Sequence, residues 1–318
     1  MPMIPQKQDA ERIGRRLKLR DLRILMTVVE CGTMGKAAER LAISQPVVSK
    51  AVSDIEHAVG VRLLDRSQRG VEPTPYGRAL IKRGIAIFDE MQQGLEEIEF
   101  LSDPTAGEVR IGATEPVAAA IVAPVIDRLS RQYPRMRFHV LATDGDTLLR
   151  ALEARNIELV VSRIAAPITD DYSLEILFHD ALVVVTGAEN PLARRRGVTL
   201  ADLIYEPWTM GPRDTNFGSL QADGFRAAGL EPPRLTVTTI SNSLRSELLG
   251  THRFLSVVPG FSLVLPRRRR GLKALPVKLP DTRKPVAIVT LKNRSLNPAA
   301  QMFIERVREL TKALAKNG

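Results

Sequence analysis

Length, composition and charge exclude several classes of protein. The chain has 318 residues, 44% of them hydrophobic, which suffices for a substantial core in two or three domains. We find no apolar run long enough to span a bilayer and no secretory segment after the polar residues 6–16. The single cysteine, Cys31, excludes an internal disulfide framework and is compatible with a reducing cytoplasm, where we expect the protein to act.

The net charge of +10 suggests an acidic partner such as nucleic acid. Residues 15–83 carry 14 basic and 7 acidic side chains, whereas residues 105–318 carry 30 and 21. Charge density is therefore higher in the N-terminal part. Attraction to phosphates would give affinity there but no sequence selectivity.

A helix, a tight turn and a second helix are predicted near the N-terminus. The first covers residues 34–41 and has small residues on its buried face. Ser44 can cap the second helix by accepting a hydrogen bond from its free amides, and Pro46 is tolerated in the first turn. The apolar face of the second helix consists of Val48, Ala51, Val52, Ile55 and Val59.

The N-terminal end of this second helix is short and polar on its other side. Compact polar side chains there can hydrogen-bond base edges when a helix enters the major groove of double-stranded DNA. The residues that we expect to contact DNA are Gln45, Pro46, Val47, Ser49, Lys50 and Ser53. The alternative is an ordinary pair of helices in a helical core, which is the commoner arrangement.

Two short extended runs follow, at residues 61–66 and 71–74. They predict a hairpin with arginines near its tip. Arg66 and Arg69 would then reach phosphates or the minor groove. This winged arrangement favours DNA binding over a plain helical hairpin.

Four motifs stand out between residues 19 and 80. They are Ala37-Ala38-Glu39-Arg40-Leu41, Ser44-Gln45-Pro46-Val47-Val48-Ser49, Gly60-Val61-Arg62-Leu63-Leu64-Asp65-Arg66 and Thr74-Pro75-Tyr76-Gly77. With these motifs, residues 19–80 resemble the winged helix-turn-helix of LysR-type bacterial transcriptional regulators, and the match covers about sixty contiguous residues with the spacing of the family. One departure is Pro73, where the family more often carries leucine; because proline cannot donate to a strand ladder, the outer wing strand is expected to end early.

One long helix is predicted from Pro75 to about Leu101, capped by Thr74. Its apolar residues have the spacing of a coiled-coil seam, at Ile81, Ile85, Phe88, Met91, Leu95 and Ile98. This seam either packs on its own domain or pairs two subunits, as the equivalent helix does in LysR-type regulators. The resemblance therefore implies a homodimer through the linker helix, and commonly a homotetramer.

Beyond a linker at residues 102–107 the chain alternates strands and helices, which predicts an α/β domain with an open, mainly parallel sheet. We expect strands at residues 108–111, 137–141, 159–162, 174–185, 208–210, 235–239, 255–258 and 286–291. Helices are expected at residues 117–132, 146–155, 215–228, 241–249 and 298–315.

Motifs of LysR-type effector domains recur here, among them Arg110-Ile111-Gly112 and Asn190-Pro191-Leu192-Ala193. The resemblance implies a two-lobed fold like that of periplasmic binding proteins, with a cleft between the lobes. The expected domains are residues 1–74 for DNA binding, 75–106 for the linker helix and 107–318 for effector binding. Within the last, lobe one is expected at about 107–163 and 267–318, and lobe two at 164–266.

A small-molecule effector in such a cleft would bind at the carboxyl ends of strands, near helix N-termini. The candidates are Thr114, Glu115, Thr143, Asp144, Ser162, Arg163, Gly211, Thr215, Thr239 and Ser241. Each serine or threonine is equally suited to be only a helix cap. The Arg163 guanidinium suits a carboxylate effector, although a surface pair with an acidic residue explains it too.

The sequences of residues 71–77 and 160–163 are similar to those of the family branch that includes the galactose-binding-protein regulators. Because that branch also contains regulators of aromatic-acid catabolism, a sugar and an aromatic or other organic acid both remain open.

Patterns typical of enzymes are missing from the sequence, so we expect no catalytic residue, metal or cofactor. His57, His139, His179 and His252 lack metal-ligand spacing, and Gly-x-Ser-x-Gly and Cys-x-x-Cys motifs are absent. The run Arg267–Arg270 is expected to be a solvated loop, with contact to DNA or an acidic partner as the alternative.

The resulting hypothesis is a sequence-specific transcriptional regulator that is controlled by a small molecule and contacts RNA polymerase. One rival is a DNA-binding repressor without a ligand. The other is an α/β solute-binding or enzymatic protein whose N-terminal helices only oligomerise.

Overall fold

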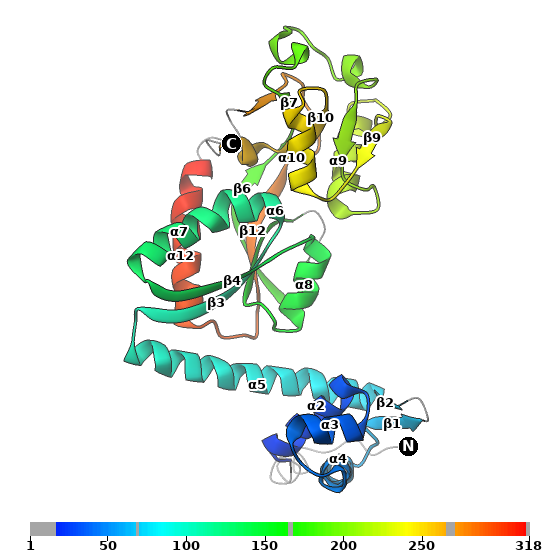
Figure 1. Cartoon of the computed structure of the whole chain (residues 1–318), viewed down its shortest axis with the longest axis vertical. Coiled ribbons are helices and arrows are strands. Elements are labelled where there is room, and N and C mark those ends of the chain that lie inside the picture. The colour runs from blue at the N-terminus through cyan, green and yellow to red at the C-terminus, as the bar shows by residue number, and fades with distance from the viewer. Residues whose placement is uncertain (1–16, 68–69, 165–167, 265–270, 316–318) are drawn as a thin grey trace. The chain divides into compact units, whose positions relative to one another are not determined.

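The structure is a computed structural model that describes residues 17–67, 70–164, 168–264 and 271–315. The chain forms two compact units, residues 1–92 and 93–318, of which the elements are labelled in Figure 1. Arg69 and the run Arg267–Arg270, both singled out in the sequence, lie outside the described residues. Within the described residues, no helix is both long and apolar enough to cross a membrane.

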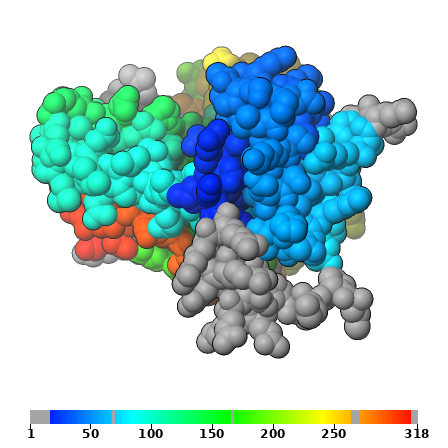
Figure 2. Space-filling view, turned by 90° about the horizontal axis from the view of Figure 1, so that it is seen from below, coloured from blue at the N-terminus to red at the C-terminus, as the bar shows by residue number. Residues whose placement is uncertain are grey.

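The first unit contains the predicted pair of helices and the wing. Its elements are α2 (Leu19–Cys31), α3 (Met34–Leu41), α4 (Gln45–Val59), β1 (Leu64–Ser67), β2 (Gly70–Pro73) and the beginning of α5 (Pro75–Ser102). The core is formed by apolar faces of α2, α3 and α4, with Leu22, Leu25, Val28, Val48 and Val52 fully buried. In Figure 2 the blue surface of these helices continues into the lighter blue of the wing, as one body.

The cap expected of Ser44 is only partly correct. Ser44 occupies the N-cap position of α4, but its side chain makes no capping hydrogen bond. Its carbonyl oxygen accepts the N–H groups of Val47 and Val48 instead. Thr74 does cap α5 with its side chain, because the N–H of Gly77 donates to its Oγ1 over 3.1 Å.

The wing strands pair antiparallel, from Leu64 opposite Pro73 to Ser67 opposite Gly70. The inner strand begins three residues later than predicted, and the outer strand ends at Pro73.

In the second unit, lobe one is built on a sheet with the order β4-β3-β5-β12-β6. Its strands are β3 (Ala106–Ala113), β4 (Arg135–Ala142), β5 (Leu159–Arg163), β6 (Tyr172–Asp180) and β12 (Lys284–Leu291). One face is covered by α7 (Ala123–Gln132) and α12 (Pro298–Ala315), and the other by α8 (Gly145–Glu153) (Figure 1).

The helix predicted over residues 117–132 is interrupted by a π-helical segment. It consists of α6 (Glu115–Val117), the π-helical η1 (Ala118–Val122) and α7 in direct succession. Pro124 stands just after the π-helical residues and has no N–H to donate to the preceding turn, which accounts for the local widening.

Lobe two has the strand order β11-β7-β10-β8-β9. The strands are β7 (Leu182–Gly187), β8 (Trp208–Met210), β9 (Leu235–Thr238), β10 (Leu255–Pro259) and β11 (Leu272–Ala274). Its helices include α9 (Asn216–Ala227) and α10 (Asn242–Gly250) and the short 3-10 helices η2 (Pro191–Arg194), η3 (Ala201–Leu203) and η4 (Gly260–Val264). Trp208, the single tryptophan of the chain, is fully buried against Phe225 of α9.

Strand pairing corrects the expected lobes. The run predicted as one strand over residues 174–185 breaks at Ala181 into β6, which pairs with β12 of lobe one, and β7, which belongs to lobe two. The chain therefore first crosses between lobes at Ala181 and not after Arg163. It crosses back after β11, because β11 pairs with β7. The prediction of a mainly parallel sheet was also wrong, since each sheet mixes parallel and antiparallel pairs.

Candidate functional site

The N-terminal end of α4 presents an accessible polar face. Ala42, at the turn before it, has a positive φ of 54°, which lets α3 and α4 meet at a sharp angle. Val48 is fully buried in the core and thereby fixes the orientation of the helix. Of the residues predicted to contact DNA, Ser49 is half-buried, and the exposed ones are Gln45, Pro46, Val47, Lys50 and Ser53.

This face combines hydrogen-bonding groups with a positive charge and an apolar contact. Val47 is 39% exposed and offers a methyl surface of the kind that contacts a thymine methyl group. Gln45 can bond an adenine edge through its amide, and Lys50 carries a charge suited to a phosphate or a guanine. The composition suits the major groove.

Glu56 attaches the wing to α4, a role that the sequence analysis missed. Its Oε1 accepts the N–H groups of Leu63 over 2.7 Å and of Leu64 over 3.2 Å. Because these amides begin the inner wing strand, the carboxylate fixes β1 against the helix that precedes it. The side chain of Arg66 on β1 is exposed, as a phosphate contact requires.

In lobe one and lobe two, several predicted effector residues are helix caps. The carboxylate of Asp144 accepts the N–H of Thr147, Thr215 accepts that of Gly218, and Ser241 accepts that of Leu244. The Thr147 amide lowers the pKa of Asp144. Capping, the alternative that the sequence left open for serine and threonine, therefore holds for Thr215 and Ser241, and Asp144 is a cap as well.

The remaining candidates differ in how accessible they are. Ser162 is buried and donates to the carbonyl of Arg163 over 3.2 Å, and the N–H of Gly211 donates to buried Gln221 over 3.0 Å. Thr114 and Thr143 are half-buried, as is Thr239, which accepts the N–H of Ser241.

Asparagine amides of lobe two bond carboxylates of lobe one. Asn242 Nδ2 donates to Oε2 of Glu115 over 3.2 Å, and Asn216 Nδ2 donates to Oδ1 of Asp146 over 2.9 Å. Arg245, which is buried, donates to Oδ1 of Asn242 over 2.6 Å and so orients its amide. These contacts join the start of α10 to that of α6 and the start of α9 to that of α8. Only Glu115 was predicted, although Asp146, Asn216 and Asn242 each lie one or two residues after a predicted site residue or cap.

Arg163 forms a buried pair with Asp180. Its Nη2 contacts the Asp180 carboxylate, and its Nη1 donates to the carbonyl of Asp180 over 2.6 Å. Burial raises the pKa of Asp180, whereas Arg163 and the amides of Phe261 and Gly260 lower it. The alternative of an ion pair with an acidic residue therefore holds for Arg163. The pair lies in the interior and not, as had been expected, at the surface. Its guanidinium is occupied at the crossing between the lobes.

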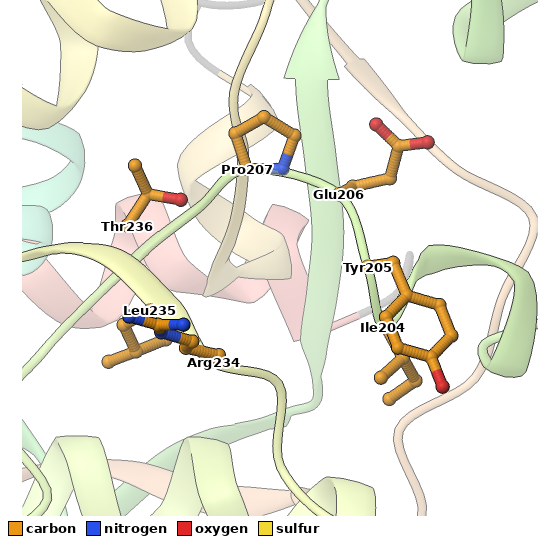
Figure 3. Close-up of a pocket in the computed structure, with 7 residues that line it drawn as sticks. All are labelled: Ile204, Tyr205, Glu206, Pro207, Arg234, Leu235 and Thr236. Carbon is orange, nitrogen blue, oxygen red and sulfur yellow. The ribbon is translucent and has the colours of Figure 1, made fainter.

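A separate cavity of about 470 Å³ lies at the edge of lobe two and is shown in Figure 3. Arg234 and Leu235 stand on one side of it and Ile204 and Tyr205 on the other. It adjoins the residues that precede β8 and β9, at the opposite strand ends from Gly211 and Thr239. One of its lining residues, Tyr205, is 97% exposed to solvent. The cavity is therefore distinct from the predicted effector residues.

Comparison with known families covers both units. The model described as "LysR substrate binding domain" matches residues 102–312. The model described as "Bacterial regulatory helix-turn-helix protein, lysR family" matches residues 19–78. The chain belongs to the LysR family.

Individual relatives agree with this assignment. The HTH-type transcriptional regulator GbpR of Azospirillum brasilense is 28% identical over 295 residues, which cover 92% of this chain and 86% of GbpR. A full-length OxyR variant from Pseudomonas aeruginosa has a TM-score of 0.64 at 20% identity, covering 94% of this chain and 97% of that one. Full-length CbnR complexed with its target DNA has a TM-score of 0.53 at 21% identity, covering 93% and 100%.

Membership of the LysR family confirms the predicted class of protein. It is a DNA-binding transcriptional regulator with an effector-binding domain and not an enzyme. The likeness to the solved LysR structures confirms the predicted fold, a winged helix-turn-helix followed by a two-lobed α/β domain.

The seam predicted along α5 of this LysR regulator divides into two parts. Ile81 and Phe88 pack on the core of the first unit, where Arg23 lies over the Phe88 ring at 5.3 Å. Ile85 of the seam is half-buried, and its later members Met91 (49%), Leu95 (59%) and Ile98 (62%) are exposed. Ile87 (40%) and Leu101 (74%), outside the predicted seam, are exposed on the same helix. Packing on its own domain, the first alternative, therefore holds for the beginning of the helix, and the later turns are accessible to a partner.

Proposed function

We propose that this LysR regulator reads an operator sequence with the N-terminal end of α4, through Gln45, Pro46, Val47, Ser49, Lys50 and Ser53. The observation that carries the proposal is the exposed polar face at the start of α4, opposite a fully buried Val48. Arg66 of the wing contacts phosphates or the minor groove, and Glu56 holds the wing against α4. The regulator acts in the cytoplasm, where its DNA target is.

The regulator acts as a homodimer paired through α5, and two dimers form a homotetramer. The exposed stripe from Ile87 to Leu101 supports the pairing, because apolar side chains of this size are usually covered. Two heads at a fixed separation recognise two half-sites and bind more tightly than one head alone. Contact with RNA polymerase then sets the output at the promoter.

The effector binds where the lobes meet, near Glu115 and Asp146. A sugar suits this boundary better than an aromatic or other organic acid, for a chemical reason. Its hydroxyl groups can donate to the carboxylates that now accept from Asn242 and Asn216, whereas an anion would be repelled by them. Arg163, the residue that favoured an acid, is already paired with Asp180.

A gel-shift experiment with the promoter of its own gene tests the DNA-binding part. Wild type should bind this promoter more tightly than unrelated DNA, and the double variant Gln45→Ala with Ser49→Ala should lose that selectivity. Each lost base contact is expected to reduce discrimination by about 1–3 kcal/mol. If the double variant remains as selective as wild type, α4 is not the reading element.

The effector part is tested by thermal unfolding with panels of neutral sugars and of aromatic acids. A sugar should raise the melting temperature and alter the footprint on the promoter. Stabilisation by acids alone would contradict the proposed effector class. Indifference to every compound would favour the rival, a repressor without a ligand.

A further inference from the structure

The last turns of α5 belong to the second unit and are attached to lobe one by buried polar side chains. Gln93 of α5 is 4% exposed, Glu158 just before β5 is fully buried, and Asn297 just before α12 is 4% exposed. Such residues are rarely buried unless they bond one another. Here they do.

The carboxylate of Glu158 is the centre of this cluster. Its Oε2 accepts the N–H of Arg110 over 2.9 Å. Its Oε1 accepts Gln93 Nε2 over 3.3 Å and Asn297 Nδ2 over 2.9 Å. One carboxylate therefore joins α5, β3, β5 and the start of α12, which are far apart in the sequence.

A second acidic residue, Glu96 of α5, adds to the attachment. Glu96 Oε2 accepts Asn297 Nδ2 over 2.6 Å, and its Oε1 lies 3.7 Å from Nη2 of Arg110. Asn297 Oδ1 in turn accepts the N–H of Ala300 and so caps α12. The cluster thus holds helix ends as well as strands.

Bonds of this kind fix geometry more strictly than apolar packing does. An apolar helix face can slide by part of a turn and stay buried, whereas a displaced hydrogen bond leaves a buried polar group without a partner. Burial raises the pKa of Glu158, while the Arg110 amide lowers it, which indicates how much the carboxylate depends on its donors. The rotation and axial position of residues 93–102 are therefore tied to lobe one.

We propose that Glu158 is a positioning residue which, with Gln93 and Asn297, joins α5 rigidly to lobe one, so that movement of lobe one changes the separation of the DNA-reading heads. The coupling to DNA rests on the proposed function. The rigid joint itself does not, because it follows from contacts within the second unit.

Hydrogen exchange of the full-length protein tests the joint. Glu158→Ala should speed exchange of the amides in residues 93–102 by about tenfold or more, because those turns lose their attachment. Leu152→Ala is the control, since it opens a cavity in the core of lobe one under α8 without touching α5. Equal exchange of residues 93–102 in Glu158→Ala and Leu152→Ala would overturn the joint.

A conservative variant separates the hydrogen bonds from mere packing. Gln93 Oε1 is buried and has no hydrogen-bond partner in the described part of the chain. In Glu158→Gln, Gln93 can turn its amide over and accept the new N–H. Asn297 loses Oε1 as an acceptor but keeps Glu96 Oε2 and the carbonyl of Glu108, so exchange should stay close to that of wild type. Adding Gln93→Ala should remove this rescue. Fast exchange in Glu158→Gln alone would contradict the assigned bonds.

Operators with altered half-site spacing test the transmission to DNA. Wild type should lose affinity when two base pairs are inserted between half-sites, and Glu158→Ala should lose several-fold less, because a loose joint tolerates both spacings. Leu152→Ala should discriminate as wild type does. Equal discrimination by Glu158→Ala would overturn the transmission, whereas failure of wild type to bind the promoter selectively would count against the proposed function alone.

Discussion

Asn216 of lobe two donates a hydrogen bond over 2.9 Å to Asp146 of lobe one. Asn216 is the first residue of α9, and Asp146 lies in the first turn of α8, so the bond joins two helix starts across the lobe boundary. A carboxylate and an amide are held together here by a directional contact that a ligand hydroxyl could replace. An effector that binds here, as proposed, would therefore compete with this hydrogen bond.

Asn216→Asp should weaken this boundary. Aspartate is tolerated at a helix N-terminus, so α9 should still form, but it places like charges against each other at Asp146. We expect faster hydrogen exchange in residues 145–148 and 215–218, with the effect reduced by salt. The swapped pair, Asn216→Asp with Asp146→Asn, recreates an amide–carboxylate bond and should restore slow exchange. Unchanged exchange in the single variant would show that the bond does not hold the lobes.

Arg66→Ala should weaken binding to all DNA sequences alike. Loss of one phosphate contact lowers the slope of log affinity against log salt by about one for each head engaged. Fluorescence anisotropy on operator and scrambled duplexes at several salt concentrations measures this. Arg234→Ala removes an exposed arginine of lobe two and serves as the control. A loss of selectivity at constant salt slope would instead make Arg66 a base-reading residue.

Arg163→Ala should destabilise the effector domain by about 3–5 kcal/mol, because it leaves the buried Asp180 without its charge partner. Urea unfolding followed by circular dichroism measures the loss, and the fluorescence of Trp208 reports on lobe two separately. The double variant Arg163→Met with Asp180→Asn removes both charges and keeps an acceptor for one of the two amides, those of Gly260 and Phe261, that donate to Asp180. It should lose less stability than Arg163→Ala, and an equal loss would argue against an uncompensated charge as the cause.

Asp144 should contribute pH-dependent stability as the N-cap of α8. Its folded pKa lies below 3.8, so the contribution is present above that pH and is lost as the pH falls through the folded pKa. Asp144→Ala should cost about 1 kcal/mol at neutral pH. Asp144→Asn keeps the cap but not the charge, so the stability difference between wild type and this variant should shrink on acidification. A difference that stays constant down to about pH 2 would contradict the lowered pKa.

Leu95→Glu with Ile98→Glu should dissociate the proposed dimer. Each of these side chains contributes about 1.5–3 kcal/mol when fully buried, so the dissociation constant should rise by more than about a hundredfold. Sedimentation velocity measures the change, and circular dichroism checks that the helices remain. Glu97→Gln with Glu99→Gln alters exposed residues of the same helix and should leave the assembly intact. A dimer that survives the first pair must use another surface.

Local patterns predicted much of the fold. The bounds of α3 and α12 agree with residues 34–41 and 298–315, because apolar periodicity lies within the segments themselves. The buried face of α4 was also predicted, which placed Gln45 and Lys50 on the accessible side. The resemblance to the LysR family was found in residues 19–80, which include α3 and α4.

Contacts between residues far apart in the sequence could be assigned only from the tertiary structure. Whether β6 joins lobe one or lobe two depends on its pairing with β12, more than a hundred residues later. The acidic partner of Arg163 and the use of Glu158 as a joint likewise depend on groups brought together only by folding. By itself the sequence determined most of the helices, the accessible face of α4 and the family, since these are set by neighbouring residues. The lobe boundary and the attachment of α5 required the structure, because hydrogen bonds between distant segments leave no periodic pattern in the chain.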